Sequence, residues 1–488
     1  MSAPVYLGID LGTQSVRVLA VDWEGAVLAS ATQKLMSRRD GVRHEQDPET
    51  WWTATTFCLR ETMTKLGSSA QIAGIAVDAT SGTILLIDDH GKPLTAALMY
   101  DDGRAKSEAA EANEVGATLW RQMSYRMQPS WALPKLMWLL HQQSIPAGAQ
   151  LAHQNDFVNA RLAGRITATD SSHALKTGYD LVRAEWPASV FESLRVPLEL
   201  LPKVVAPGTK VGAVGHDAAE QTGVPAGVPI FAGMTDGCAA QIASGATEVG
   251  SWNSVIGTTL VVKGVTRDLL RDPLGVIYSH RSIDGLWLPG GASSTGAAAI
   301  VAEFDAADLD TLNHAAELAG PTPLVVYPLV SSGERFPFAA PDATGFTLGR
   351  AGSTEERYRG VLQGIAIVER ISFEALQKLG AATDGRFTIS GGAVKSEALN
   401  QMRADILERE LSVPEVTESA FGMAMLVAAA ESSMQQVTRR MVRITRTIAP
   451  KRPFREYAEQ YAALVSELER RGWLSPGLSA TAAREASE

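Results

Sequence analysis

Residues 6–21 read YLGIDLGTQSVRVLAV, and this stretch decides the fold. Tyr6 to Asp10 is a short run of strand type, Val16 to Val21 is a second, and a Gly-containing segment over residues 11–15 separates them. Two short apolar runs joined in this way predict a β-hairpin. We therefore expect the chain to open on a hairpin with a polar tip.

The same pattern occurs a second time. Gly257-Thr258-Thr259 lies between the strand-like runs 254–257 and 260–263, and its Gly-Thr pair follows the pair at Gly12-Thr13 by 257 − 12 = 245 residues. A repeat of this length is too long for a solenoid. It predicts two related lobes that each begin with the same hairpin.

Composition narrows the class of protein. Of the 488 residues, 45% are hydrophobic and 20% are charged, as in soluble globular proteins. The net charge of -10 argues against a nucleic-acid partner. Two distant cysteines make no disulfide framework, and the eight histidines lack the spacing of zinc ligands. No signal peptide and no apolar run of membrane-spanning length is present. We expect a cytoplasmic protein without a membrane partner.

Further elements are expected along the chain. A helix should begin after Asp47, with Pro48 at its first position, and another after Ser353, where Glu356 completes a capping box. The remaining expectations are strands at 72–78, 83–87, 228–232 and 387–390, helices at 131–141, 354–379 and 397–411, and a disordered tail after Ser475.

The two hairpin tips are candidate phosphate sites. Backbone N–H groups that converge on one point bind an anion, and glycine permits close approach. Thr13 and Thr258 add hydroxyl donors, and Asp10 is placed to organise Mg²⁺ through water. The first tip is not a Walker A loop, because it lacks Gly-Lys-Ser/Thr and leads into a strand. A plain hairpin turn with a polar tip is the alternative.

Two more segments follow buried strand-like runs. Asp236, in the segment Met234 to Gly237, can accept a proton from an attacking hydroxyl, or it can cap a helix. Gly391-Gly392 leaves room for a flat base or a phosphate, or it makes a tight turn. The polar clusters Asp78 to Thr83 and Asp101 to Arg104 offer donors and acceptors for sugar hydroxyls, and solvated turns are the alternative.

Together these residues resemble the FGGY family of carbohydrate kinases, from Tyr6 to about Leu468. Gly8 to Thr13 resembles the family's opening phosphate hairpin, and Glu45 to Pro48 with Trp51-Trp52 is similar to its next block. Trp131 to Leu139 resembles the first family signature, with departures at Ala132 and His141. The looser second signature is matched by Gly333 to Pro337, Pro341 and Gly345-Phe346.

The resemblance implies an α/β fold of two ribonuclease H-like lobes, of the actin/Hsp70/sugar-kinase type, around a central cleft that binds ATP and Mg²⁺. It implies an N-terminal lobe over 1–246, a C-terminal lobe over 247–474 and a tail over 475–488. Asp236 falls on the family's catalytic base and, with Asp10, on its metal region. The implied nucleotide residues are Gly12, Thr13, Gln14, Gly257, Thr258, Thr259, Gly391, Gly392 and Asn400. The implied sugar residues are Thr80, Ser81, Gly82, Asp102, Arg104 and Asp236.

The motifs indicate the identity of the sugar substrate less closely than they indicate the reaction. Xylulose kinases usually carry Met-His-Gly where this chain has Thr80-Ser81-Gly82, and the run from Asp78 to Gly82 is nearer to ribulose-type kinases. A ketopentose such as D-xylulose or D-ribulose is the expected substrate, with glycerol, L-ribulose or gluconate as alternatives. A nucleotide switch of the actin/Hsp70 type and a sugar sensor without catalysis are the rival functions. A homodimer is one candidate for the oligomeric state.

Overall fold

A computed structural model describes residues 3–142 and 144–474, so the tail expected after Ser475 lies outside the described residues. Contacts divide the chain into two compact units. Unit 1 comprises Met1–Thr247, Ser279–Leu288 and Val416–Arg443, and unit 2 comprises Glu248–Tyr278, Pro289–Glu415 and Ile444–Glu488. In the described ranges no helix is long and apolar enough to cross a membrane.

Unit 1 is built on a six-stranded sheet in the order β12-β13-β6-β1-β2-β3. The strands are β1 (Pro4–Leu11), β2 (Ser15–Asp22), β3 (Val27–Lys34), β6 (Gln71–Ala79), β12 (Lys210–Ala213) and β13 (Pro229–Phe231). β1 forms the expected antiparallel hairpin with β2 and pairs in parallel with β6 on its other side. The carboxyl ends of β1 and β6 therefore meet at one edge of the sheet.

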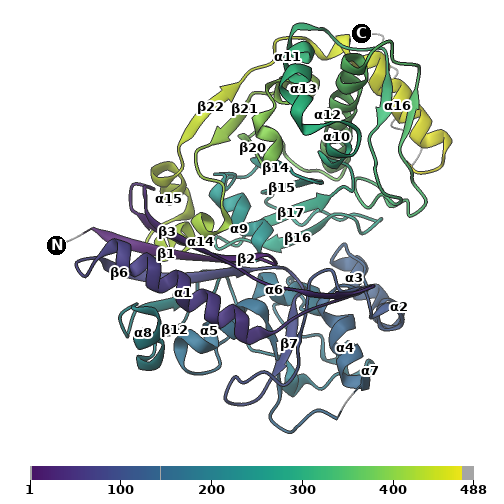
Figure 1. The fold of residues 1–488 in the computed structure, drawn as a ribbon. Coiled ribbons are helices and arrows are strands. Elements are labelled where there is room, and N and C mark those ends of the chain that lie inside the picture. Colours follow the sequence, from purple (N-terminus) through teal and green to yellow (C-terminus); the bar gives the residue numbers. More distant parts are fainter. Residues whose placement is uncertain (1–2, 143, 475–488) are drawn as a thin grey trace. The chain divides into compact units, whose positions relative to one another are not determined.

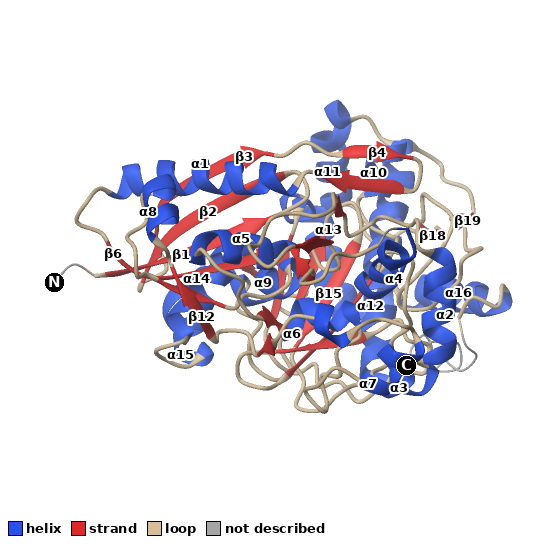
Figure 2. Cartoon of the chain, turned by 90° about the horizontal axis from the view of Figure 1, so that it is seen from below, coloured by secondary structure: helices blue, strands red, loops and turns tan. Residues whose placement is uncertain are grey.

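Helices cover both faces of this sheet (Figure 1). On one side lie α1 (Pro48–Leu66), α5 (Gln154–Ala163) and α8 (His216–Thr222), and on the other lie α9 (Asp236–Ala243) and α14 (Ser419–Ala429). Figure 2 shows α1 running along β3 and β2, which it contacts. Asp47 accepts a hydrogen bond from Glu49 N and Pro48 is the first helical residue, which confirms the predicted helix start.

Helix α14 is buried from Ala420 to Ala429, as its apolar sequence after Ser419 requires. A glycine in β1 permits its close packing on the sheet, because a Cβ at Gly8 would lie 1.7 Å from Ala420 O. This contact brings residues 416–443 into unit 1, although they are distant from the rest of that unit in sequence.

A smaller five-stranded sheet of unit 1, in the order β4-β5-β8-β7-β9, carries the segments proposed for sugar binding. Its strands are β4 (Arg38–Asp40), β5 (Arg43–Gln46), β7 (Ile84–Ile87), β8 (Ala97–Leu98) and β9 (Gln150–His153). The remaining elements of unit 1 are α2 (Lys106–Val115), α3 (Ala117–Gln122), α4 (Ala132–Gln142), β10 (Thr169–Asp170), α6 (Ser171–Ala174), η1 (Leu175–Thr177), α7 (Ala188–Ser193), η2 (Leu198–Leu200), β11 (Val204–Val205) and α15 (Met434–Met441).

Unit 2 repeats the strand order of unit 1. Its strands β14 (Trp252–Ile256), β15 (Leu260–Gly264), β17 (Trp287–Ala292), β20 (Phe387–Ser390), β21 (Leu411–Pro414) and β22 (Ile444–Ile448) are neighbours in the order β17-β15-β14-β20-β21-β22. As in unit 1, the first strand pairs antiparallel with the second and parallel with a later strand. The structure confirms that each unit begins its sheet with the hairpin found twice in the sequence.

The helices of unit 2 gather on one side of these strands (Figure 1). They are α10 (Ala298–Glu303), α11 (Leu309–Leu318), α12 (Thr354–Lys378), α13 (Glu397–Leu407) and α16 (Ala458–Arg470). The other elements are β18 (Val325–Tyr327), β19 (Phe346–Leu348), η3 (Ala306–Asp308), η4 (Gly392–Lys395) and η5 (Phe454–Glu456). Strand β16 (Tyr278–Arg281) precedes β17 in the sequence, and its residues from Ser279 onward belong to unit 1.

The ends of two helices of unit 2 differ from the sequence expectation. Ser353 caps α12 by accepting from Glu356 N, but the Glu356 carboxylate accepts from Gly352 N, so only half of the capping box forms as predicted. The helix expected to run to residue 411 ends at Leu407, because Glu408 adopts a left-handed conformation with φ of 52°. Leu411 instead begins β21.

Candidate active site

Three carboxyl groups meet at the carboxyl edge of the large sheet of unit 1. Asp10 near the end of β1 and Asp78 near the end of β6 are partners in the strand register. An isolated bridge between Ala79 and Thr235 then places the start of α9, and with it Asp236, beside them. This edge is where open α/β sheets bind their ligands.

The pKa values of two of these acids are raised. Burial, followed by the charge of Asp236, raises the pKa of Asp10 to about 6. Burial and then the charges of Asp10 and Asp236 raise the pKa of Asp78 well above its ordinary value. In the described part of the chain neither Asp78 oxygen accepts a hydrogen bond. A protonated Asp78 can instead donate to Asp10, which works to lower the pKa of Asp10.

Asp236 is the first residue of α9, and Thr235 occupies the N-cap position. The alternative interpretation of Asp236 as the helix N-cap is therefore wrong by one residue. Its Oδ1 accepts from Gly237 N at 2.7 Å. The turn into the helix is held by Ser172, whose Oγ accepts from Thr235 N at 3.1 Å, and by Ser419, whose Oγ donates to Asp236 O at 3.2 Å. A half-buried carboxylate at a fixed helix start can accept a proton from a bound hydroxyl.

The tip of the first hairpin follows Asp10 directly. Gly12 N donates to Ser15 O at 3.0 Å, which closes the turn. Gln46 Nε2 donates to Thr13 O at 2.7 Å, while its Oε1 accepts from Trp51 Nε1. Gln14, at the exposed end of the tip, has its carbonyl held by Leu35 N. The carbonyl groups of Thr13 and Gln14 are thus held by hydrogen bonds from Gln46 and Leu35.

The segment Thr80-Ser81-Gly82 leaves β6 immediately after Asp78 and Ala79. Gln154 Oε1 accepts from the Thr80 hydroxyl at 2.7 Å, and Lys176 Nζ donates to Ser81 O at 3.2 Å. Gly82 has φ of 97°, a conformation that favours glycine. The Ser81 hydroxyl is buried without a hydrogen-bond partner among the described residues, so it is available to a ligand.

Asp102 and Arg104 form a tight network of their own. The Asp102 carboxylate accepts hydrogen bonds from His44 N at 2.7 Å and from Arg104 Nε at 2.8 Å. The Arg104 guanidinium also forms an ion pair with Glu45 at 2.7 Å and lies 4.8 Å from the centre of the Trp138 ring. Burial works to raise the pKa of Asp102, but the hydrogen bonds from Arg104 and His44 outweigh it, so the pKa is lowered. Asp102 therefore orients the Arg104 guanidinium.

Two residues of this site, Asp78 and His173, were not identified individually from the sequence. Asp78 was included only as part of the polar cluster Asp78 to Thr83, although its position at the end of strand 72–78 could have singled it out. His173 is fully buried, and its ring nitrogens contact Asp170 at 2.7 Å and Ala79 O at 3.3 Å. Burial works to lower the pKa of His173, but Asp170 outweighs it and the pKa is raised. The contact with Asp170 is local, since Asp170 caps the helix that carries His173, but the contact with Ala79 depends on tertiary folding.

Apart from Gly12, Thr13 and Gln14, the predicted nucleotide residues lie in unit 2, and two of them follow the ends of adjacent parallel strands. Gly257 follows β14, and Gly391 follows β20, which pairs with β14 up to Val255 and Ser390. Gly391 has φ of 90°, and a Cβ there would lie 2.5 Å from Ile256 O. The structure thus brings Gly257 and Gly391 together and shows why residue 391 is a glycine.

Asn400 lies on α13, after the short helix η4 that Gly392 opens. It is fully buried, its Nδ2 donates to Val394 O at 2.8 Å, and its Oδ1 accepts from Arg403 at 3.3 Å. The Nδ2 group of Asn400 therefore holds the segment that follows Gly391-Gly392, while its Oδ1 bonds within α13. Contact with a nucleotide remains a prediction for these residues.

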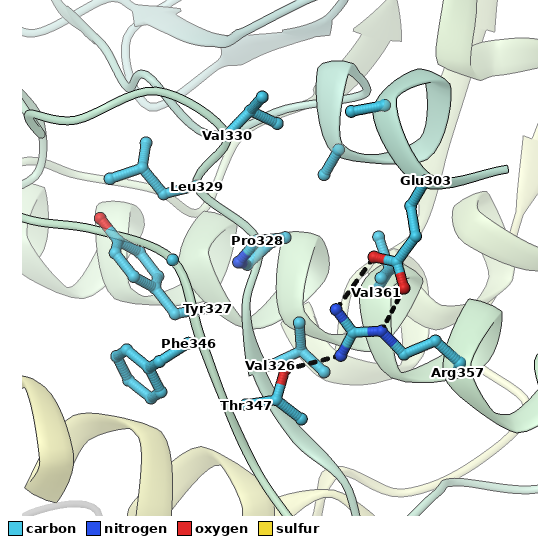
Figure 3. A pocket seen from close by; sticks show the side chains of 13 residues that line it. Glu303, Val326, Tyr327, Pro328, Leu329, Val330, Phe346, Thr347, Arg357 and Val361 are labelled. Carbon is cyan, nitrogen blue, oxygen red and sulfur yellow. Dashed lines mark hydrogen bonds and ion pairs between the residues drawn. The ribbon is translucent and has the colours of Figure 1, made fainter.

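A cavity of about 370 Å³ lies elsewhere in unit 2, between α10, α12 and the β18–β19 hairpin. Figure 3 shows its Glu303–Arg357 pair, in which Arg357 donates to both carboxylate oxygens, and the bond from Arg357 to Thr347. None of the predicted site residues lines it. In the part of the chain that the structure describes, no group of three or more His, Cys, Asp or Glu residues is arranged to hold a metal ion.

Comparison with known proteins agrees with this geometry. Residues 5–243 match the N-terminal domain of the FGGY family of carbohydrate kinases, and residues 252–431 match its C-terminal domain. The chain therefore belongs to the FGGY family of carbohydrate kinases, which are phosphotransferases that act on a sugar hydroxyl and use ATP.

Individual relatives are moderately similar. The xylulose kinase of Escherichia coli K12 is 27% identical over 430 residues, which cover 83% of this chain and 86% of that protein. A glycerol kinase of Gloeobacter violaceus is 27% identical over 437 residues, 85% of either chain. The crystal structure of a xylulose kinase from Rhodospirillum rubrum matches with a TM-score of 0.86 at 25% identity, over 96% of this chain and 99% of that one.

Proposed function

We propose that this kinase transfers the γ-phosphoryl group of ATP to a terminal hydroxyl of a ketopentose, with Asp236 as the general base. The observation that carries the proposal is the electrostatic coupling of Asp236 to Asp10 at the sheet edge where Thr80-Ser81-Gly82 begins. A carboxylate in this place can orient a sugar hydroxyl and accept its proton as the new P–O bond forms.

The phosphate groups are assigned to the two hairpin tips. Gly12, Thr13 and Gln14 on one tip and Gly257, Thr258 and Thr259 on the other offer backbone N–H groups and hydroxyls to a polyphosphate. Gly391 and Gly392 leave the end of β20 free of side chains, which suits the rest of the nucleotide. These donors position the phosphoryl group for transfer and offset its charge.

Mg²⁺ is the expected metal, and the residues of unit 1 fit it. Asp10 and Asp236 offer carboxylate oxygens, and Mg²⁺ is usually held by one or two carboxylates together with waters and substrate phosphates. A cage of three or more protein ligands is therefore not required. When bound, the ion would offset charge on the β- and γ-phosphate oxygens.

Substrate choice is assigned to the small sheet of unit 1 and the turn after β6. The free Ser81 hydroxyl and the ordered Arg104 guanidinium are the polar groups that we assign to the sugar, with Thr80, Gly82 and Asp102 around them. The xylulose kinase relatives support a ketopentose such as D-xylulose, and the run from Asp78 to Gly82 supports D-ribulose. The glycerol kinase relative keeps glycerol as the second candidate.

A coupled assay of ADP release tests this proposal. The purified chain is given ATP, Mg²⁺ and one candidate at a time: D-xylulose, D-ribulose, L-ribulose, D-xylose, gluconate or glycerol. We expect a ketopentose to give the highest kcat/KM. Faster ADP release with glycerol or gluconate would contradict the substrate assignment, and ADP release that no sugar stimulates would favour a nucleotide switch or a sensor.

A further inference from the structure

Glu334 is a buried carboxylate of unit 2 that accepts five hydrogen bonds. It is only 3% exposed. Its Oε1 accepts from Ser294 N at 2.6 Å and from Arg335 N at 2.9 Å. Its Oε2 accepts from Tyr327 Oη at 2.8 Å and from the hydroxyls of Ser293 and Thr295 at 2.9 and 3.3 Å. Every one of these donors is a neutral group.

The residues that Glu334 holds form hydrogen bonds with the second phosphate hairpin, whose tip is Gly257-Thr258-Thr259. Ser293 N donates to Leu260 O at 2.9 Å, and Leu260 N donates to Thr295 O at 2.7 Å. Leu260 is the first residue after the hairpin tip Gly257-Thr258-Thr259. Glu334 thus fixes a segment that in turn fixes the strand leaving the tip.

The next residues of the same segment contact the tip itself. Ala297 N donates to Gly257 O at 2.9 Å, and Ala298 N donates to Thr258 O at 3.2 Å. Gly296 lies so close that a Cβ there would be 2.6 Å from the Cα of Thr259. The carbonyl groups of Gly257 and Thr258 in the tip therefore accept hydrogen bonds from the segment 293–298.

The chemistry of a carboxylate suits this position. An ionised Glu334 can only accept, so it can hold the backbone N–H of Ser294 and three hydroxyls at once without competing for their acceptors. A glutamine would present an NH₂ group to some of these donors and leave them unsatisfied, which is unfavourable for a buried group. A phosphate cradle needs its donors fixed before the ligand arrives, because misplaced donors stabilise the transferred group poorly.

We propose that Glu334 is a positioning residue for the phosphate hairpin Gly257-Thr258-Thr259, acting through residues 293–298. The inference rests on the proposed function, in which this hairpin binds the phosphates of ATP. It assigns Glu334 to the nucleotide and not to the sugar.

The test compares Glu334→Gln with the wild-type chain in steady-state kinetics and in ADP binding by calorimetry. We expect the KM for ATP and the Kd for ADP to rise by about 10- to 100-fold, because the hairpin would lose part of its fixed geometry. The KM for the best sugar should stay within about 2-fold, because the changed bonds lie in unit 2 and the sugar residues in unit 1. If Glu334 had only a structural role, Glu334→Gln would lower the melting temperature and would not change the KM for ATP more than the KM for the sugar.

Asp272→Asn is the matched control. Asp272 is also a buried carboxylate of unit 2, and it accepts from the backbone N–H groups of Leu274, Val276 and Ile277. It lies in the loop beyond Gly264, at the end of β15 that is remote from the tip. This variant should change the melting temperature alone.

Equal KM values for ATP in Glu334→Gln and the wild type would overturn the inference, as would a parallel rise in both KM values. Should Glu334→Gln fail to fold, Ser293→Ala removes one link of the network and should still raise the Kd for ADP by about 3- to 10-fold. An unchanged Kd in that variant would also overturn it. A wild-type chain that binds ADP but phosphorylates no sugar would refute the proposed function alone, since the ADP affinities still test Glu334.

Discussion

Asp78 is the register partner of Asp10 on the neighbouring parallel strand, and the charge of Asp10 helps to raise the pKa of Asp78. Two acids this close cannot both ionise at low cost. Asp78 has no hydrogen-bond donor within the described residues, which is the environment of a neutral carboxyl group. Asp10 is then left as the charged member that faces Asp236.

The Asp10→Asn variant should alter how stability depends on pH. The pKa of Asp10 is raised to about 6 in the folded chain, so the folded state binds this proton more tightly than the unfolded state. Stability should therefore fall as the pH rises from about 4 to about 6, by at most about 3 kcal/mol. Asp10→Asn should make this decline smaller in urea denaturation at pH 4, 5, 6 and 7, and the part that remains is due to Asp78, whose pKa burial also raises. An identical pH dependence in the variant and the wild type would contradict the assignment.

Lys135 should show the opposite dependence. It is fully buried, donates to the carbonyls of Leu98 and Met99, and burial lowers its pKa to about 7. The unfolded state therefore binds this proton more tightly, and stability should rise as the pH increases from about 7 to about 10.

Denaturation of Lys135→Met tests this expectation. The variant should lose the rise above pH 7 and about 1–3 kcal/mol from the hydrogen bonds that Lys135 donates to Leu98 O and Met99 O, although Met99 O keeps its bond from Asp102 N. Lys65→Met is the control, since Lys65 donates to Ser30 O from an exposed position. A rise above pH 7 that persists in Lys135→Met would show that another group causes it.

Asp102→Asn should weaken sugar binding without affecting ATP. The change removes the charge that orients Arg104, and hydrogen bonds to charged groups contribute about 1.5–3 kcal/mol. We expect the KM for the sugar to rise by about 10- to 100-fold and the KM for ATP to stay unchanged. Asp88→Asn, on an exposed turn, is the control. A rise in the KM for ATP alone would remove Asp102 from the sugar site.

Local sequence patterns were enough to predict the parts of the fold that form locally. Both hairpins and the start of α1 depend on neighbouring residues, such as the Asp47-Pro48 pair. The end of α13 was missed because the left-handed residue there is Glu408 and not a glycine. The membership of residues 416–443 in unit 1 was also missed, since it follows from the close contact of Gly8 with Ala420.

The residues of the candidate site likewise fall into two groups: those that a local motif reveals and those that only the tertiary structure reveals. Asp10, Asp236 and the Gly-Thr tips carry visible motifs, so the sequence sufficed to propose them. The coupling of Asp78 to Asp10 depends on the register of two strands that lie more than sixty residues apart in sequence. The bonds of Glu334 to residues 293–295 likewise join distant segments. Pairing of this kind is a property of the tertiary structure.

Turnover by Asp236→Asn tests the central claim most directly. An amide cannot accept the proton of the sugar hydroxyl, and a general base contributes about 10²- to 10⁴-fold to the rate. We expect kcat to fall by that factor with the best sugar, while the Kd for ADP and the melting temperature stay close to those of the wild type. Turnover near the wild-type rate would contradict the claim that Asp236 is the base of a sugar kinase.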